Sequence, residues 1–177
     1  LQMREVRHMK LAGALLAFLG CCAAGAVRAS AARRRLDALS ALCEALCLMR
    51  SELGTRLSTI PDMAERASGQ TRGAAKDFFT ALSARMDELG RVELAQLWAE
   101  CAAAELSVLA GAEAREFAAL GAVLGRCDAD MQLAAISACE AYLRAALEHA
   151  RGDYPQQRRL SLGIAAAAGA LLVIVFI

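Results

Sequence analysis

The sequence of 177 residues has few of the residues that build sheets, rigid loops and disulfide frameworks. It contains two prolines, two tyrosines and one tryptophan, and aromatic residues make up only 5% of the chain. Strand-favouring residues are scarce, whereas alanine, leucine, glutamate and arginine, which are good helix formers, are abundant. We therefore expect an all-α protein.

The sequence also lacks an excess of charge of either sign. Its 20 basic and 19 acidic residues give a net charge of +1, and the two signs are interspersed. Proteins that follow a phosphate backbone carry a concentrated basic face. The balance of charge therefore argues against nucleic acid as a partner.

Motifs that carry chemistry are missing. There are two histidines, no Cys-x-x-Cys pair and no glycine-rich phosphate loop, and the seven cysteines are interpreted as reduced thiols that pack as small hydrophobes. Cys43 and Cys47 lie four apart, but no nearby histidine completes a metal site. We expect no catalytic residue, metal, cofactor or small-molecule substrate, and hence a protein that is not an enzyme. A membrane enzyme would need clustered titratable groups on the helices, and the sequence offers none.

Two long runs carry no charge, at residues 11–27 and 160–177. A bilayer core of ~30 Å requires roughly 20 apolar residues, with about 17 as a lower limit. The sequence therefore predicts two transmembrane helices around one helical domain. The segments, in order, are a leader at 1–8, a transmembrane helix at 9–28, a cytoplasmic helical bundle at 29–154 and a transmembrane helix at 160–177.

Arginines on the inner flanks of both runs favour a cytoplasmic middle segment under the positive-inside rule. The alternative is an exported or lipid-anchored helical interaction protein whose first run is a cleaved signal. The "ASA" at Ala29–Ala31 resembles a signal cleavage site, and "FLGC" at Phe18–Cys21 resembles a lipoprotein site. Arginines 33–35 follow closely, and such charges oppose export.

Between the runs, apolar residues recur at helical spacing and predict an antiparallel bundle of about six helices. Gly54 is expected to stop the first helix and Pro155 to break the chain before the second run. Glu140 and Arg144 are expected on the solvated face of the last helix. The expected later helices span residues 60–67, 74–89, 92–109, 112–124 and 128–151. The stripe of the first helix is Leu39, Leu42, Leu46, Met49 and Leu53, and that of the last is Leu133, Ile136, Cys139, Leu143 and Leu147.

The stretch "LGAVLGRCDADMQ" at 120–132 predicts a helix–turn–helix corner that can also serve as an interaction motif. Gly121 would lie inside a helix and let another helix approach closely. Gly125 would turn the chain in a left-handed conformation, and Asp128 would cap the next helix. Gln132 is not needed for the cap, and it is expected to make a buried hydrogen bond or a partner contact. The motif residues are Leu120, Gly121, Leu124, Gly125, Asp128 and Gln132.

These features together resemble the family of stage III sporulation protein AB of endospore-forming bacteria, over Met9 to Ile177. The likeness rests on "MKLAGALLAFLG" from Met9, on the arginine-flanked leucine helix "RRRLDALSALCEALCLMRSEL", and on the element LGxxLGxxDxxxQ at 120–132. Tyr154, "SLG" at Ser161–Gly163 and the apolar end complete it.

The resemblance implies a structural role. The family is similar to the cytoplasmic helical domain of type II secretion and type IV pilus platform proteins. A member would be a non-enzymatic platform subunit in the mother-cell membrane, within a complex that links mother cell and forespore. Its partners would be other subunits of that channel complex, including a secretion-type ATPase.

Overall fold

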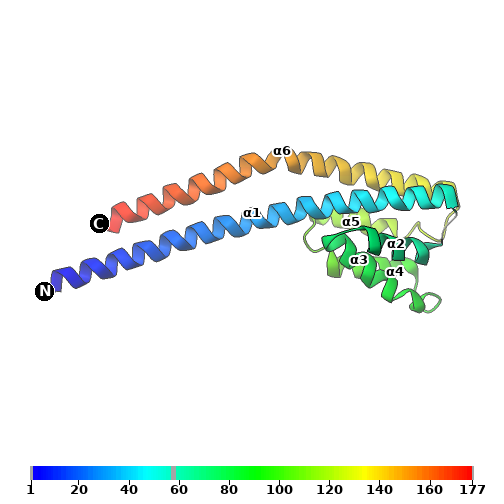
Figure 1. Cartoon of the computed structure of the whole chain (residues 1–177), viewed down its shortest axis with the longest axis horizontal. Helices are drawn as coiled ribbons and strands as arrows, with labels where there is room; N and C mark the ends of the chain where they lie inside the picture. The colour runs from blue at the N-terminus through cyan, green and yellow to red at the C-terminus, as the bar shows by residue number, and fades with distance from the viewer. Residues whose placement is uncertain (1, 57–58, 177) are drawn as a thin grey trace. The chain divides into compact units, whose positions relative to one another are not determined.

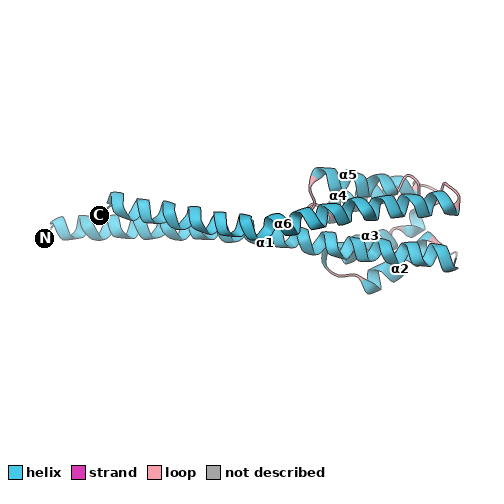
Figure 2. Cartoon of the chain, turned by 90° about the horizontal axis from the view of Figure 1, so that it is seen from above, coloured by secondary structure: helices cyan, strands magenta, loops and turns pink. Residues whose placement is uncertain are grey.

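The computed structural model describes the backbone of residues 2–56 and 59–176. The side chains of residues 1–19, 21–22, 55–58, 154–162, 164–166 and 168–177 lie outside the description. The described chain is all-helical, as the sequence predicts, and contains no strand (Figure 2). Its helices are α1 (Gln2–Arg56), α2 (Ile60–Gln70), α3 (Gly73–Ala84), the 3₁₀-helix η1 (Met86–Glu88), α4 (Leu94–Glu105), α5 (Gly111–Leu120) and α6 (Ala129–Phe176).

The chain divides into two compact units. The first comprises residues 1–33 and 151–177, and the second, the bundle, comprises residues 34–150. Most side chains of the two runs predicted to span a membrane, 11–27 and 160–177, lie outside the description. Over the part of the chain that is described, no helix combines the length and the hydropathy that a membrane crossing requires.

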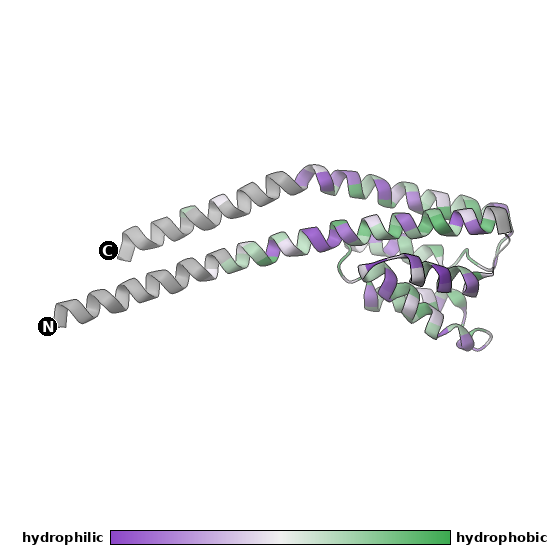
Figure 3. Cartoon of the chain, viewed as in Figure 1, coloured by the Kyte–Doolittle hydropathy of each residue, from purple (hydrophilic) through white to green (hydrophobic). Residues whose placement is uncertain are grey.

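The bundle core is built on the two predicted stripes. On α1, Leu39, Leu42 and Leu46 are fully buried, and on α6, Ile136 and Leu143 are fully buried. Hydrophobic and hydrophilic segments alternate along both helices within the bundle (Figure 3). A spacing of three and four residues aligns the apolar side chains on one face, and burying that face stabilises the helices.

Helices α2 to α5 cover one side of the α1–α6 pair (Figure 1). Their centre is an aromatic cluster in which the ring of Phe78 lies 4.9 Å from those of Phe79 and Trp98 and 5.0 Å from that of Phe117. The three contacts are edge-to-face, the arrangement that aromatic quadrupoles favour. Three of the five phenylalanines and the single tryptophan are thus concentrated at one point of the core.

Several predicted helix boundaries are wrong. α1 continues through Gly54 to Arg56, because one exposed glycine costs less than the burial of the apolar stripe that precedes it on α1 contributes. α6 continues through Pro155, because a proline removes one backbone hydrogen bond while the turns on either side keep theirs. α2 runs to Gln70, three residues beyond the predicted end at 67, and its N-terminus is capped by Thr59.

The prediction of a solvated Glu140 is also wrong. This residue is only 5% exposed, although it lies on the polar part of the α6 pattern. Its carboxylate accepts a hydrogen bond of 2.6 Å from Arg144 and lies 3.3 Å from the guanidinium of Arg50 on α1. Arg144 and Arg50 offset the cost of the burial, because a buried carboxylate needs charged or hydrogen-bonding partners.

Candidate functional site

The first half of the corner is a packing contact between α4 and α5. α5 ends at Leu120, four residues earlier than predicted, so Gly121 caps the helix instead of lying inside it. Leu120 and Leu124 are buried in the core, as the sequence predicts. A Cβ added to Gly121 would lie 2.5 Å from both Cβ and Cγ of Trp98. Only glycine therefore allows α4 to approach this closely.

Trp98 fixes the same contact through its polar edge. Its indole Nε1 donates a hydrogen bond of 2.8 Å to the backbone carbonyl of Phe117 on α5. That carbonyl lies near the end of α5, and the bond satisfies the buried indole donor. Gly121 and Trp98 together therefore hold the two helices close to each other.

The second half of the corner is a turn held by hydrogen bonds. Gly125 has a φ of +75°, the left-handed conformation predicted for it. The carboxylate of Asp128 accepts a bond of 2.8 Å from the backbone N–H of Met131, which is the predicted N-cap of α6. The change of chain direction thus falls between these two residues.

Gln132, whose role the sequence left open, clasps the turn. Its Nε2 donates to the carbonyl of Cys127 at 2.7 Å, and its Oε1 accepts from the N–H of Gly125 at 3.3 Å. One side-chain amide therefore satisfies a backbone donor and a backbone acceptor in the loop that precedes α6. Both partners are backbone groups, so the sequence pattern alone gave no sign of them.

Glu113 is a buried charged residue that the sequence analysis missed. It is 3% exposed, and both of its carboxylate oxygens bind the guanidinium of Arg35 on α1, with Nε at 3.1 Å. It also accepts a bond of 2.8 Å from the N–H of Ala110, at the start of α5. A glutamate at the third position of a helix is a common partner for that N–H, and this was the available signal.

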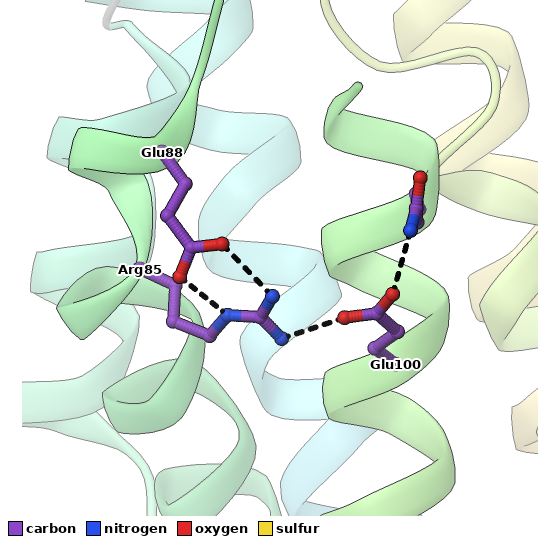
Figure 4. Close-up of polar contacts among 4 residues, drawn as sticks. Arg85, Glu88 and Glu100 are labelled. Atoms are coloured by element: carbon purple, nitrogen blue, oxygen red, sulfur yellow. Dashed lines mark hydrogen bonds and ion pairs between the residues drawn. The ribbon is translucent and has the colours of Figure 1, made fainter. Parts of the chain in front are cut away.

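A second ionic cluster joins η1 to α4 (Figure 4). Arg85 donates to both oxygens of Glu88, at 2.8 and 3.0 Å, and to Glu100 at 2.8 Å. The bonds from Arg85 lower the pKa of the Glu88 carboxyl. Gln96 first and Arg85 second lower the pKa of the Glu100 carboxyl, while Glu88 and Glu100 raise the pKa of the Arg85 guanidinium. The cluster therefore favours the charged forms of Arg85, Glu88 and Glu100.

The described cysteines are free thiols. Burial raises the pKa of the Cys139 thiol to about 12 and also raises that of Cys101. Both are therefore protonated at neutral pH, which disfavours a nucleophilic role. Within the described residues, no group of three or more metal-binding side chains comes together, and Cys43 and Cys47 belong to no such group.

A surface of mixed charge on the bundle is hollowed. A groove of about 640 Å³ lies between α1, the α2–α3 connection and the end of α4. Ala38 and Ala41 lie in it, and charged residues of both signs, including Asp37 and Arg72, line it. Such a surface suits a protein partner better than a small apolar ligand.

The polar contacts described for this bundle cap its helices or join one helix to another. They define the bundle as a helical scaffold. The family of stage III sporulation protein AB matches residues 10–177, and the chain belongs to that family. The membership supports a role in sporulation. Comparison with curated proteins and with solved structures finds no match.

Proposed function

We propose that the chain is a non-enzymatic platform subunit in the mother-cell membrane, within a secretion-like complex of endospore formation. Residues 11–27 and 160–177 would anchor it, and the bundle would face the cytoplasm. It would dock a secretion-type ATPase and position the other subunits of a channel between mother cell and forespore. The observation that carries the proposal is a helical bundle enclosed by two uncharged runs in a chain of this family.

The bundle has the properties that docking requires. Its core is dense and aromatic, so the surface is presented on a rigid support. The groove beside α1 offers charged and apolar groups together, a mixture that transient protein interfaces share. The α5–α6 corner would contribute by fixing where α6 begins.

The docking proposal is tested by pull-down of the companion ATPase with the full chain, extracted from membranes in mild detergent. A variant without residues 34–150 keeps both uncharged runs and serves as the matched control. We expect binding by the full chain and none by this variant. Equal capture of the ATPase by both would overturn the docking role of the bundle.

The anchoring proposal is tested by thiol labelling in intact cells. Cys47 is exposed on the bundle, so a membrane-impermeant maleimide should label it only after permeabilisation. Cys21 and Cys22 are first replaced by serine. A cysteine added after Ile177 should react in intact cells.

Mass spectrometry of the mature N-terminus separates the proposal from the exported alternative. A retained first run is expected. A mature chain that begins near Cys21 or Ala31 would favour an exported or lipid-anchored interaction protein instead.

A further inference from the structure

The groove beside α1 is lined by charged side chains that have no partner in the described part of the bundle. They are Arg34, Asp37 and Glu44 on α1, together with Arg72 and Glu105. Four of them are exposed, and Glu105 is half-buried. Among the described residues, none of these five side chains forms an ion pair or a hydrogen bond. Their charges are therefore available to groups outside the chain.

The neighbouring buried charges are paired inside the bundle. Arg35, the residue after Arg34, binds Glu113, and Arg50 pairs with Glu140. A single unpaired charge is ordinary on a solvated surface. Charges of both signs gathered around one hollow instead form a polar rim of the kind that surrounds a protein interface.

The floor of the groove is made of small apolar side chains. Ala38 and Ala41 are 4% and 8% exposed, and Ala74 and Val108 are partly buried against the core. An apolar floor inside a charged rim is the usual arrangement of a protein interface. The alanines also let a partner backbone come close to α1, because the distance between helix axes depends on the side chains at the contact.

The walls of the groove favour a helix as the occupant. From Arg34 to Glu44, the α1 wall extends roughly 15 Å, or about three helical turns. The backbone groups along this wall are bonded within α1, so an extended peptide would find no N–H or C=O there to pair with. A helix satisfies its own backbone groups and requires only side-chain contacts.

The charges of the rim define the chemistry of that helix. Carboxylates lie on both walls, with Asp37 and Glu44 on α1 and Glu105 at the end of α4. α4 has no basic residue in its last turn, so the negative end of the helix dipole adds to the charge of Glu105. A complementary helix therefore carries basic side chains toward these carboxylates and acidic side chains toward Arg34 and Arg72.

We propose that the groove receives a helix of the docked partner, with small or apolar side chains on the floor and basic side chains beside Asp37, Glu44 and Glu105. The inference rests on the proposed function, because it assigns to this groove the contact between the bundle and the secretion-type ATPase. The occupant is thus a basic amphipathic helix of that ATPase.

Charge reversal in the full chain tests the rim, with pull-down of the ATPase in mild detergent as the measurement. Asp37→Lys combined with Glu44→Lys should lower ATPase capture about tenfold or more, because the lysines would repel a basic helix. Glu65→Lys combined with Glu116→Lys makes the same change of net charge at exposed positions outside the groove, and capture should stay at the parent level. Equal capture by the two double variants would overturn the proposal.

A steric change separates occupancy of the groove from attraction at a distance. Ser40 lines the groove, so Ser40→Trp would fill it and should abolish capture, whereas Ser40→Ala should keep it. Circular dichroism and the melting temperature show whether each variant is folded. Normal capture by a folded Ser40→Trp chain would refute the groove, and the exposed charge-reversal pair decides the matter if that variant does not fold.

Cross-linking tests the kind of occupant. Four native cysteines are first changed to serine, namely Cys21, Cys22, Cys47 and Cys127. With a short maleimide–amine reagent, Ser40→Cys should join lysines of one ATPase segment that are three or four residues apart, as on one face of a helix. Glu65→Cys, outside the groove, should give no such link. Links from position 40 to a strand of the ATPase, or to another subunit alone, would overturn the proposal.

The outcomes distinguish this inference from the proposed function. Capture of the ATPase by the parent and equally by the groove variants would leave docking in place and refute the groove. A parent chain that captures no ATPase would refute both.

Discussion

Residues 120–124 and residues 125–132 are neighbours in the chain, but different forces hold them. The first group is fixed by packing: Leu120 and Leu124 are buried, and Gly121 lies against Trp98. The second group is near the surface and is fixed by hydrogen bonds: the carboxylate of Asp128 accepts from a backbone N–H, and the amide of Gln132 donates to a backbone carbonyl. The comparison shows that one motif can combine a contact that tolerates no added atom with a turn that is held by several small contributions.

The largest effect is expected at the packed half. Gly121→Ala should lower the free energy of unfolding by about 3 kcal/mol, because its Cβ would overlap the root of a fully buried indole that cannot move aside. Urea titration of the full chain in detergent measures the change. Gly69→Ala is the control: its Cβ meets nothing within 4 Å, and alanine should stabilise α2 by roughly 0.5 kcal/mol. Equal stability of the two variants would refute the Trp98 contact.

A smaller loss is expected where the chain turns. Gly125→Ala should cost about 1–2 kcal/mol, because a side chain is disfavoured at a φ of +75°. Gly125→Asn should cost less, since asparagine tolerates the left-handed region better than alanine does. The same titration measures both. A greater loss for asparagine than for alanine would point to crowding at this position instead of backbone strain.

The hydrogen-bonded half should respond in smaller steps. Asp128→Ala should cost about 1 kcal/mol through the lost cap, and Gln132→Ala about 0.5 kcal/mol through its two hydrogen bonds, one exposed and one part-buried. The double variant should differ from the sum of the two, because both side chains fix the same turn. Strict additivity in this double-mutant cycle would show that cap and clasp act independently.

The smallest effect is expected from the ionic cluster, and it depends on pH. The folded pKa values of Glu88 and Glu100 are lowered, so their stabilisation is present above the unfolded value of about 4.3 and is lost as the pH falls through the folded values. The melting temperatures of the parent and of Arg85→Met should therefore differ at pH 7 and converge in acid. Arg72→Met, outside the cluster, is the control. A difference that is constant with pH would contradict this account.

Much of the fold could be predicted because it depends on local repetition. The apolar stripes of α1 and α6 follow from spacing alone, and the left-handed Gly125 and the cap at Asp128 follow from residue types that have few other uses. The helix ends at Gly54 and Pro155 could not be predicted, because neighbouring structure overrides the weak preference of a single residue.

The polar part of the candidate site was harder to predict, because its partners are distant in the sequence. Glu113 finds Arg35 across 78 residues, and Glu140 finds Arg50 on another helix. The third helix position of Glu113 predicts its bond to the Ala110 N–H, but no helical pattern predicts that these carboxylates are buried while others, such as Glu116, are exposed. Their burial depends on which helices become neighbours.

The sequence by itself determined that the protein is helical, which faces of α1 and α6 enter the core, and where the chain turns at 125–128, because these depend on residue preferences and short-range spacing. Only the tertiary structure decided that Gly121 packs against Trp98, that Gln132 forms hydrogen bonds with the backbone of the turn and that Met131 and Tyr142 on α6 stay exposed. Those outcomes depend on how elements far apart in the chain approach each other, and no local sequence pattern predicts the spatial distance between such elements.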